Sequence, residues 1–174
     1  SLSVTAEERN KAKKSSVLIL IFAEKQELMV CLIKRPERMK HHGGQIALPG
    51  GRIEKDETAL QTALRETEEE IGILPEKIKI LGSLSELYVA VSGFLIHPFV
   101  GWLNEKPQFQ LNPDEVEKTL LFPVSKFSDT FDWVERESKS GIRKVPCIHF
   151  ENEVIWGATA MILAEFYDML KEAI

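Results

Sequence analysis

A glycine turn stands directly before a strongly acidic helix in residues 48–73, LPGGRIEKDETALQTALRETEEEIGI. Thr58 followed by Gln61 fits a capping box, and Gly72 is typical of the residue that ends a helix. We therefore predict a helix that begins just after Thr58 and ends at Gly72. Its apolar residues recur with helical spacing, which predicts a stripe packed on a sheet. The predicted stripe consists of Leu60, Leu64, Thr67 and Ile71.

Three glutamates of this helix share a different face. With Glu66 as the reference, Glu70 lies about 40° to one side and Glu69 about 60° to the other, so we expect all three to be exposed together. Glu66 and Glu70 repel each other by roughly 0.2–0.5 kcal/mol. A solvated acidic face is one interpretation. However, the bare backbone of Gly50 and Gly51 lets carbonyls approach a ligand, and clustered oxygens suit a hard divalent cation such as Mg²⁺.

Composition places this motif in one acidic domain. The 174 residues, 44% of them hydrophobic, are enough for one core and too few for two comfortable ones. We expect residues 1–174 to form a single domain, with residues 1–14 as a peripheral segment. The net charge of −5 argues against a nucleic-acid partner. No apolar run approaches the ~20 residues that cross a bilayer, and Cys31 and Cys147 are expected to be reduced thiols in the cytoplasm.

The rest of the chain alternates strand-like and helical segments. The apolar runs 16–23 and 28–34 are separated by a charged turn and predict two adjacent strands. The first run follows a basic segment, as in a signal peptide, but a buried strand explains it better. Further strands are predicted near residues 78–89 and 93–103 and in a hairpin of residues 130–137 and 144–151. Residues 154–170 have helical spacing, so we expect a mixed sheet between helices.

The spacing of Gly51, Glu57 and the run Arg65 to Ile73 resembles the Nudix box, with Thr67 at a position that is usually aliphatic. This resemblance implies an α/β fold, an α/β/α sandwich with a mixed sheet and a loop–helix–loop catalytic motif. It also implies hydrolysis of a nucleoside diphosphate linked to another group. The residues that would hold Mg²⁺ or Mn²⁺ are Glu66, Glu69, Glu70 and the backbone carbonyl of Gly50.

The remaining charged positions of the box have implied supporting roles. Arg65 would orient the metal-binding carboxylates, and Glu57 and Gly51 would support them without touching the metal. For the general base, Glu69 and Glu66 rank ahead of Glu115, which comes from outside the box. The alternative interpretation of Glu115 is a helix-start carboxylate in the segment NPDEV.

The segment upstream of the box resembles the coenzyme A diphosphatase branch of the family. The matching residues are Arg35, Lys40, His42, Gly44, Gln45, Ala47, Pro49, Gly50 and Gly51. Four positions depart from the usual pattern, namely Ile33, Pro36, Lys40 and Leu48. A basic loop before a metal site could clamp additional phosphates, such as the 3′-phosphate of coenzyme A. The candidate substrate-binding residues are Arg35, Lys40, His42 and Gln45.

Three functions remain open from the residues and the resemblance. The first is a coenzyme A diphosphatase that yields 4′-phosphopantetheine and adenosine 3′,5′-bisphosphate. The second is a Nudix pyrophosphatase for ADP-ribose, NADH or a dinucleoside polyphosphate. The third is a non-catalytic binding module, against which the intact set of Glu66, Glu69 and Glu70 argues. The expected partner is a small nucleoside diphosphate, and a homodimer remains open.

Overall fold

The computed structural model describes residues 4–138 and 141–173. The strands of the larger sheet are β1 (Lys13–Glu24), β2 (Glu27–Lys34), β3 (Ile46–Ala47), β4 (Gly50–Arg52), β5 (Lys79–Ser83), β6 (Leu87–Val89), β7 (Phe94–Trp102) and β8 (Lys118–Pro123). The smaller sheet contains β9 (Phe131–Ser138), β10 (Gly141–Phe150) and β11 (Glu153–Trp156). The α-helices are α1 (Ala6–Lys11), α2 (Ala59–Ile71), α3 (Phe127–Thr130) and α4 (Ala158–Glu172), with one-turn 3₁₀ helices at Pro75–Lys77 and Val124–Lys126.

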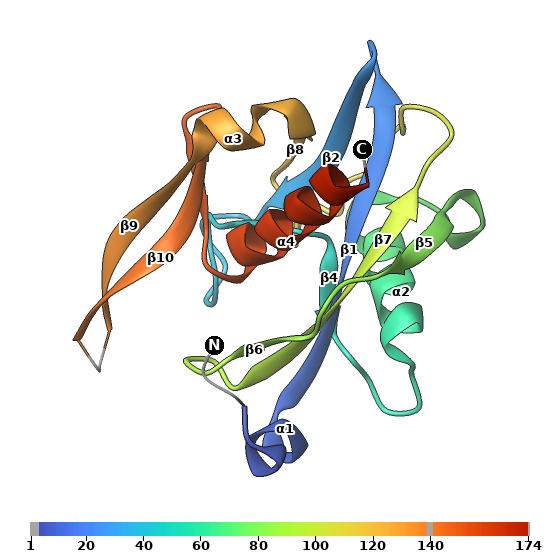
Figure 1. Cartoon of the computed structure of the whole chain (residues 1–174). Helices are drawn as coiled ribbons and strands as arrows, with labels where there is room; N and C mark the ends of the chain where they lie inside the picture. The colour runs from blue at the N-terminus through green and yellow to red at the C-terminus, as the bar shows by residue number, and fades with distance from the viewer. Residues whose placement is uncertain (1–3, 139–140, 174) are drawn as a thin grey trace.

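The larger sheet is mixed. Its central order is β3-β2-β1-β7-β5, with β8 also paired to β2, β4 to β1 and β6 to β7. The pair β1 and β7 is parallel, whereas the other strand pairs in this sheet are antiparallel. The smaller sheet is a meander, and its β9–β10 hairpin projects away from the rest of the molecule (Figure 1).

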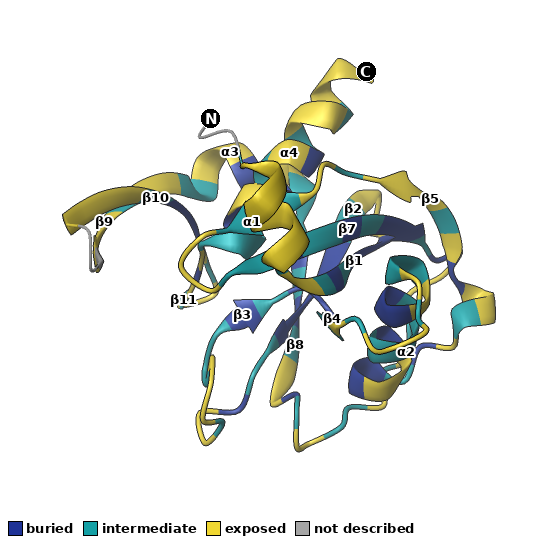
Figure 2. Cartoon of the chain, turned by 90° about the horizontal axis from the view of Figure 1, so that it is seen from below, coloured by how far each residue is buried: buried dark blue, intermediate teal, exposed yellow. Residues whose placement is uncertain are grey.

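The helices α2 and α4 cover opposite faces of the larger sheet (Figures 1 and 2). Alternate residues of β1 supply both cores, because successive side chains of a strand point to opposite faces. Leu18 and Leu20 pack on the α2 side with Ala63, whereas Ile19 and Ile21 pack on the α4 side. The predicted α/β/α sandwich is therefore confirmed.

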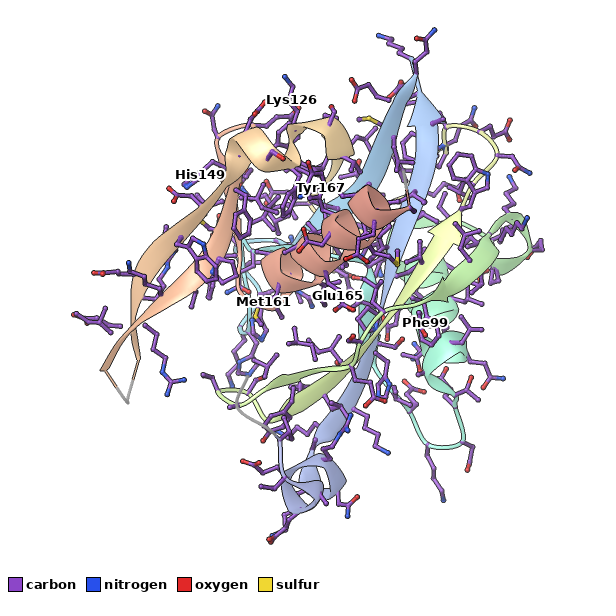
Figure 3. All side chains as sticks on the ribbon, in the orientation of Figure 1. Phe99, Lys126, His149, Met161, Glu165 and Tyr167 are labelled. Atoms are coloured by element: carbon purple, nitrogen blue, oxygen red, sulfur yellow. The ribbon has the colours of Figure 1, made fainter. Side chains whose placement is uncertain are left out.

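Two polar contacts hold α4 in place, from side chains labelled in Figure 3. The Glu165 carboxylate accepts a hydrogen bond of 2.9 Å from the backbone N–H of Ser85, which lies just before β6. The hydroxyl groups of Tyr167 and Ser128 lie 2.6 Å apart and share a hydrogen bond. These contacts connect the middle of α4 to the segment before β6 and to α3.

The bounds of α2 agree with the sequence prediction, whereas the predicted buried stripe is confirmed at Thr67 and Ile71 and is wrong at Leu60 and Leu64. Thr58 and Gln61 form both bonds of the capping box, and Gly72 ends the helix in a left-handed conformation with φ of 74°. The buried residues of α2 are Thr62, Ala63, Thr67, Glu70 and Ile71. Leu60 and Leu64 are only half-buried. Small side chains on this stripe let the helix approach β1 and β4 closely, which rotates the leucines toward the rim.

This rotation overturns the predicted exposure of Glu70. The residue is only 2% exposed, although the helical spacing had placed it with Glu66 and Glu69 on an open face. Glu70 follows Ala63 and Thr67 at intervals of seven and three residues, so it belongs to the buried side of α2. The face on which the sequence predicts Glu66, Glu69 and Glu70 is consequently partly inside the fold.

The C-terminal segment also differs from the prediction. Its first residues form β11, which pairs with β10 through Ile155 and Ile148. The helix α4 begins only after Gly157, whose φ of 65° favours glycine. Helical spacing had been assigned to the whole segment because both a buried strand and a buried helix are rich in apolar residues.

Two further expectations can be compared with the fold. Cys31 and Cys147 are both buried and free, which agrees with the predicted reduced thiols. The segment containing Glu115 is a turn that leads into β8, so the alternative interpretation of a helix start is wrong. Among the helices that the structure describes, none has the length and apolarity needed to cross a membrane.

The burial on α2 predicts which truncation destabilises the fold. Ile71 is 0% exposed, whereas Leu64 is half-buried. Ile71→Ala should therefore lower the free energy of unfolding by about 2–5 kcal/mol, since it leaves a cavity in the core between α2 and the sheet. Leu64→Ala, the matched control, should cost clearly less. Urea denaturation of both variants measures the difference, and equal losses would contradict the observed rotation of the helix.

Candidate active site

The glycine turn before α2 allows two carboxylates to approach the sheet. The backbone N–H of Gly50 donates a hydrogen bond of 2.7 Å to Glu70 Oε1. A Cβ atom on Gly51 would collide with the Glu66 carboxylate, and one on Gly50 would collide with β1. Figure 2 shows α2 next to β4, which is a strand of the larger sheet. Gly51 therefore allows the close approach of α2 to β4, and Gly50 allows the close approach of β4 to β1.

Arg65 contacts three carboxylates through its guanidinium group. Its Nε and Nη2 donate to the two oxygens of Glu57 at 2.5 and 3.0 Å. Its Nη1 donates to Glu66 Oε1 at 3.0 Å and to Glu69 Oε2 at 3.1 Å. The two bonds from Nε and Nη2 form a bidentate, charge-assisted contact with Glu57, and this contact fixes the plane of the Arg65 guanidinium. Arg65 thereby sets the orientation of Glu66 and Glu69.

Glu57 anchors this arrangement from outside the helix. The hydrogen bonds from Arg65 hold the pKa of the Glu57 carboxyl down at about 2, and the hydroxyl of Thr62 contributes in the same direction. Thr62 Oγ1 donates to Glu57 Oε2 at 2.7 Å. Glu57 is therefore ionised throughout the physiological pH range and serves as the fixed partner of Arg65.

The carboxylates of Glu66 and Glu115 and the guanidinium of Arg35 act electrostatically on the Glu70 carboxyl, on the buried side of α2. Burial raises the pKa of the Glu70 carboxyl to about 8. The negative charges of Glu66 and Glu115 contribute to this rise, whereas the positive charge of Arg35 opposes it. Burial also raises the pKa of Glu66, and the charge of Glu115 acts in the same direction. The four groups are therefore within electrostatic reach of one another.

A docked loop carries Glu115 to this cluster. The N–H groups of Gln110 and Asn112 donate to the carbonyls of Ile71 and Glu70 at 3.0 Å each. These two carbonyls belong to the last turn of α2, whose C=O groups have no partners within the helix. The loop thus continues the hydrogen bonding of α2 and places Glu115 near its carboxylates. Glu115 Oε2 is shielded from solvent and has no hydrogen-bond partner among the described residues.

The predicted substrate-binding residues occupy different positions in the loop between β2 and β3. Arg35 lies at the base, and its Nε is buried without a hydrogen-bond partner among the described residues. Gln45 is half-buried, and its Oε1 lies 3.0 Å from Nδ1 of the exposed His42. Lys40 is exposed near the tip. The structure therefore places Arg35 with the carboxylates and Lys40 at the rim.

The glutamate carboxylates of α2 are the kind of ligand that a hard cation prefers, but in this structure they accept hydrogen bonds from Arg65 and Gly50 instead. Within residues 4–138 and 141–173, no three His, Cys, Asp or Glu side chains are grouped so that they could hold a metal ion. The reason is that Glu66 and Glu69 turn toward Arg65, and Glu70 turns toward Gly50. The set nevertheless offers several carboxylates and an unpartnered buried oxygen, which is the chemistry that Mg²⁺ and Mn²⁺ prefer. A cation would therefore require some of these side chains to rotate.

Sequence reasoning missed two groups that assemble this site. Asn112 docks the Glu115 loop on α2, and Arg38 donates to the carbonyl of Pro113 at 2.8 Å. Both interactions use backbone atoms of segments that are far apart in the chain. No local sequence pattern indicates such pairs, because every residue has a backbone carbonyl and the sequence does not show which one will accept the bond.

Comparisons with known proteins point to one family. A family profile described as NUDIX domain matches residues 12–141. The chain is 33% identical over 154 residues to a protein of Pectobacterium atrosepticum named "Uncharacterized Nudix hydrolase NudL", with 87% of this chain and 79% of that protein covered.

Two solved structures share the fold. The Nudix hydrolase RenU of M. smegmatis aligns with a TM-score of 0.63 and 17% identity, over 93% of this chain and 85% of that chain. The NUDIX domain of Shewanella oneidensis NrtR, solved with ADP ribose, aligns with a TM-score of 0.54 and 20% identity, over 73% of this chain and 82% of that chain.

The burial of Glu70 predicts a pH-dependent stability in the metal-free protein. Its pKa is about 8 in the fold and near 4.5 in the unfolded chain, so raising the pH through this window destabilises the wild type. Glu70→Gln removes that loss. Two pKa units alone correspond to ~2.7 kcal/mol, and each kcal/mol shifts Tm by roughly 2–4 °C. The Tm of the variant in EDTA should therefore gain at least about 5 °C on the wild type between pH 5 and 9.

The exposed Glu68 provides the control for this experiment. Glu68→Gln removes a carboxylate from the same turn of α2 without removing a buried charge. Its Tm difference from the wild type should stay the same at both pH values. A Glu70→Gln variant that behaves like Glu68→Gln would contradict the buried ionisation of Glu70.

Proposed function

Because the chain belongs to the Nudix hydrolase family, whose members use divalent cations and act on nucleoside diphosphate derivatives, we propose that it hydrolyses the diphosphate of coenzyme A. The products would be 4′-phosphopantetheine and adenosine 3′,5′-bisphosphate. The observation that carries the proposal is that Arg65 holds Glu66 and Glu69 together while Glu66, Glu115 and Arg35, which precedes a basic loop, all act electrostatically on Glu70. An anionic diphosphate would need both a metal site and fixed cations beside it.

The metal-binding role falls to carboxylates of α2. Glu66, Glu69 and Glu70 would hold Mg²⁺ or Mn²⁺, together with the carbonyl of Gly50. When bound, such cations would neutralise the diphosphate and lower the pKa of a water molecule. Arg65 supports this role by holding Glu66 and Glu69 close together, and Glu57 keeps Arg65 in place.

Glu115 is the general base in this proposal. Its Oε2 accepts no hydrogen bond from the described residues and is free to take a proton. Glu66 and Glu69, which ranked first from the sequence, both accept hydrogen bonds from Arg65, so their oxygens are less available. The base would take a proton from the attacking water at the cluster. This order of candidates reverses the expectation from the sequence.

The phosphate-binding groups divide into two sets. Arg35 lies close enough to influence Glu70, so it would contact the diphosphate at the reacting centre. Lys40 and His42 are exposed on the loop and would contact a phosphate farther along the substrate. Gln45 would steady His42 through their contact. A basic rim above the reacting centre matches coenzyme A, which carries a 3′-phosphate in addition to its diphosphate.

A second specificity has some support. The related NUDIX domain of NrtR was solved with ADP ribose, which is also a nucleoside diphosphate but lacks a 3′-phosphate. ADP-ribose would use the same carboxylates and Arg35 without needing Lys40. The exposed basic residues at the loop tip therefore favour coenzyme A over this alternative.

Substitution of the metal-binding carboxylates should abolish turnover without unfolding the protein. Glu69→Gln and Glu70→Gln should each lower kcat by roughly two orders of magnitude or more, because they remove charge that holds the metal. Glu68→Gln is the matched control and should retain kcat, since this exposed residue points elsewhere. Steady-state assays at saturating Mg²⁺ measure the effect. Near-normal turnover of both Glu69→Gln and Glu70→Gln would refute the proposed metal site.

The two phosphate-binding sets predict different effects on substrate choice. Charge-assisted hydrogen bonds to phosphate are worth ~1.5–3 kcal/mol, or roughly ten- to a hundredfold in selectivity. Lys40→Ala should therefore narrow the preference for coenzyme A over its 3′-dephospho form by roughly tenfold at this exposed site. Arg35→Ala should lower kcat/KM for both substrates and change their ratio less.

The measurement is kcat/KM for coenzyme A, 3′-dephospho-coenzyme A, ADP-ribose, NADH and diadenosine polyphosphates, with Mg²⁺ and Mn²⁺. A wild-type enzyme that cleaves ADP-ribose far better than coenzyme A would refute the proposed substrate. If coenzyme A is preferred but its 3′-phosphate has no effect, the substrate stands and the role of Lys40 is wrong.

A further inference from the structure

We propose that Arg38 is a positioning residue that holds Glu115 at the carboxylate cluster, an inference that rests on the proposed function. Arg38 lies in the loop between β2 and β3. Its Nη2 donates to the carbonyl of Pro113 at 2.8 Å and lies 3.2 Å from Asp114 Oδ1. Pro113 and Asp114 directly precede Glu115 in the turn.

The loop that presents Arg38 is compact. Arg35 N–H donates to the Gln45 carbonyl at 2.9 Å, and Gly44 N–H donates back to the Arg35 carbonyl at 2.9 Å. A Cβ atom on Gly43 would lie 2.8 Å from the carbonyl oxygen of Met39, so the chain folds tightly over itself here. Arg38 therefore projects from a compact loop that is held by its own hydrogen bonds. Such a loop gives the Arg38 guanidinium a fixed position from which to hold the Glu115 turn.

The turn that carries Glu115 is fixed at its two ends. Asn112 N–H donates to the Glu70 carbonyl at 3.0 Å, and Glu117 N–H donates to the Lys34 carbonyl at 2.8 Å. Between these two bonds, the middle of the turn is held by contacts within the turn itself, such as the 3.1 Å hydrogen bond from Asp114 N–H to Asn112 Oδ1. Arg38 adds a bond to this middle from across the site. The side chain of Glu115 follows immediately.

The orienting contact is the bond to the backbone. The side chains of Arg38 and Asp114 are 65% and 88% exposed, and an ion pair between such groups contributes little. The guanidinium bond to the Pro113 carbonyl involves a charged donor and constrains the main chain itself. Loss of Arg38 should therefore matter more than loss of the Asp114 carboxylate.

Two other roles for Arg38 make different predictions. A cation that binds a substrate phosphate would change KM, and it would do so whatever residue stands at position 115. A surface ion pair without function would change neither kinetic constant. A positioning role acts on kcat through Glu115, so its effect should disappear when the Glu115 carboxylate is already absent.

The test is a double-mutant cycle on the full chain. The variants are Arg38→Ala, Arg38→Lys, Asp114→Asn, Glu115→Gln and the double variant Arg38→Ala/Glu115→Gln. Arg38→Ala should lower kcat about fivefold with KM within about twofold, because the charged bond to a carbonyl is lost. Arg38→Lys should recover part of this loss, and Asp114→Asn should stay within about twofold of wild type. In the Glu115→Gln background, Arg38→Ala should change kcat by less than about twofold.

Equal effects of Arg38→Ala in both backgrounds, or an effect confined to KM, would overturn the positioning role. Hydrogen exchange provides a second readout that needs no activity. The amides of Glu115, Val116 and Glu117 all donate within or beside this turn. They should exchange at least about threefold faster in Arg38→Ala than in wild type, and at the wild-type rate in Asp114→Asn. Unchanged exchange in Arg38→Ala would also refute the proposal.

Failure of the proposed substrate would be distinguishable from failure of this inference. If the wild type hydrolyses ADP-ribose and ignores coenzyme A, the substrate proposal is wrong, and the cycle is measured on ADP-ribose. The exchange experiment is independent of either substrate. The Arg38 inference is then judged on the same two outcomes.

Discussion

The hydrogen bond from the Gly50 N–H to the buried Glu70 carboxylate is the interaction on which the architecture of the site depends. It connects the glycine turn on β4 to the last turn of α2. A carboxylate can reach that N–H only if α2 packs closely on the sheet, and this in turn requires Ala63 and Thr67 on its buried stripe. The same contact explains why the larger Leu60 and Leu64 are displaced to the rim.

This arrangement destabilises the charged form of the Glu70 carboxylate. Burial raises the pKa of Glu70, and the nearby Glu66 and Glu115 add repulsion. Such mutually destabilised ionisable groups are more common at functional sites than in structural cores. Arg65 and Arg35 moderate the repulsion without removing it. A divalent cation bound at the proposed site would supply the positive charge that Arg65 and Arg35 do not provide.

The site is completed by backbone bonds between segments that are distant in the chain. The carbonyls at the end of α2 accept from the loop that carries Glu115, and the loop between β2 and β3 reaches the same turn through Arg38. Each contact uses groups that a helix end or a turn leaves unpaired. The bonds that satisfy these backbone groups therefore also hold the turn that carries Glu115.

The sequence by itself determined the helix of the box, because its cap residues Thr58 and Gly72 act locally. It also determined the family, through residues at fixed spacing, and the strands of the first hairpin, through their apolar runs. Only the tertiary structure decided which side of α2 is buried, since helical spacing defines stripes without saying which one meets the sheet. It also decided the place of Glu115 and Arg35 beside Glu70, because that proximity arises from packing between segments far apart in the chain.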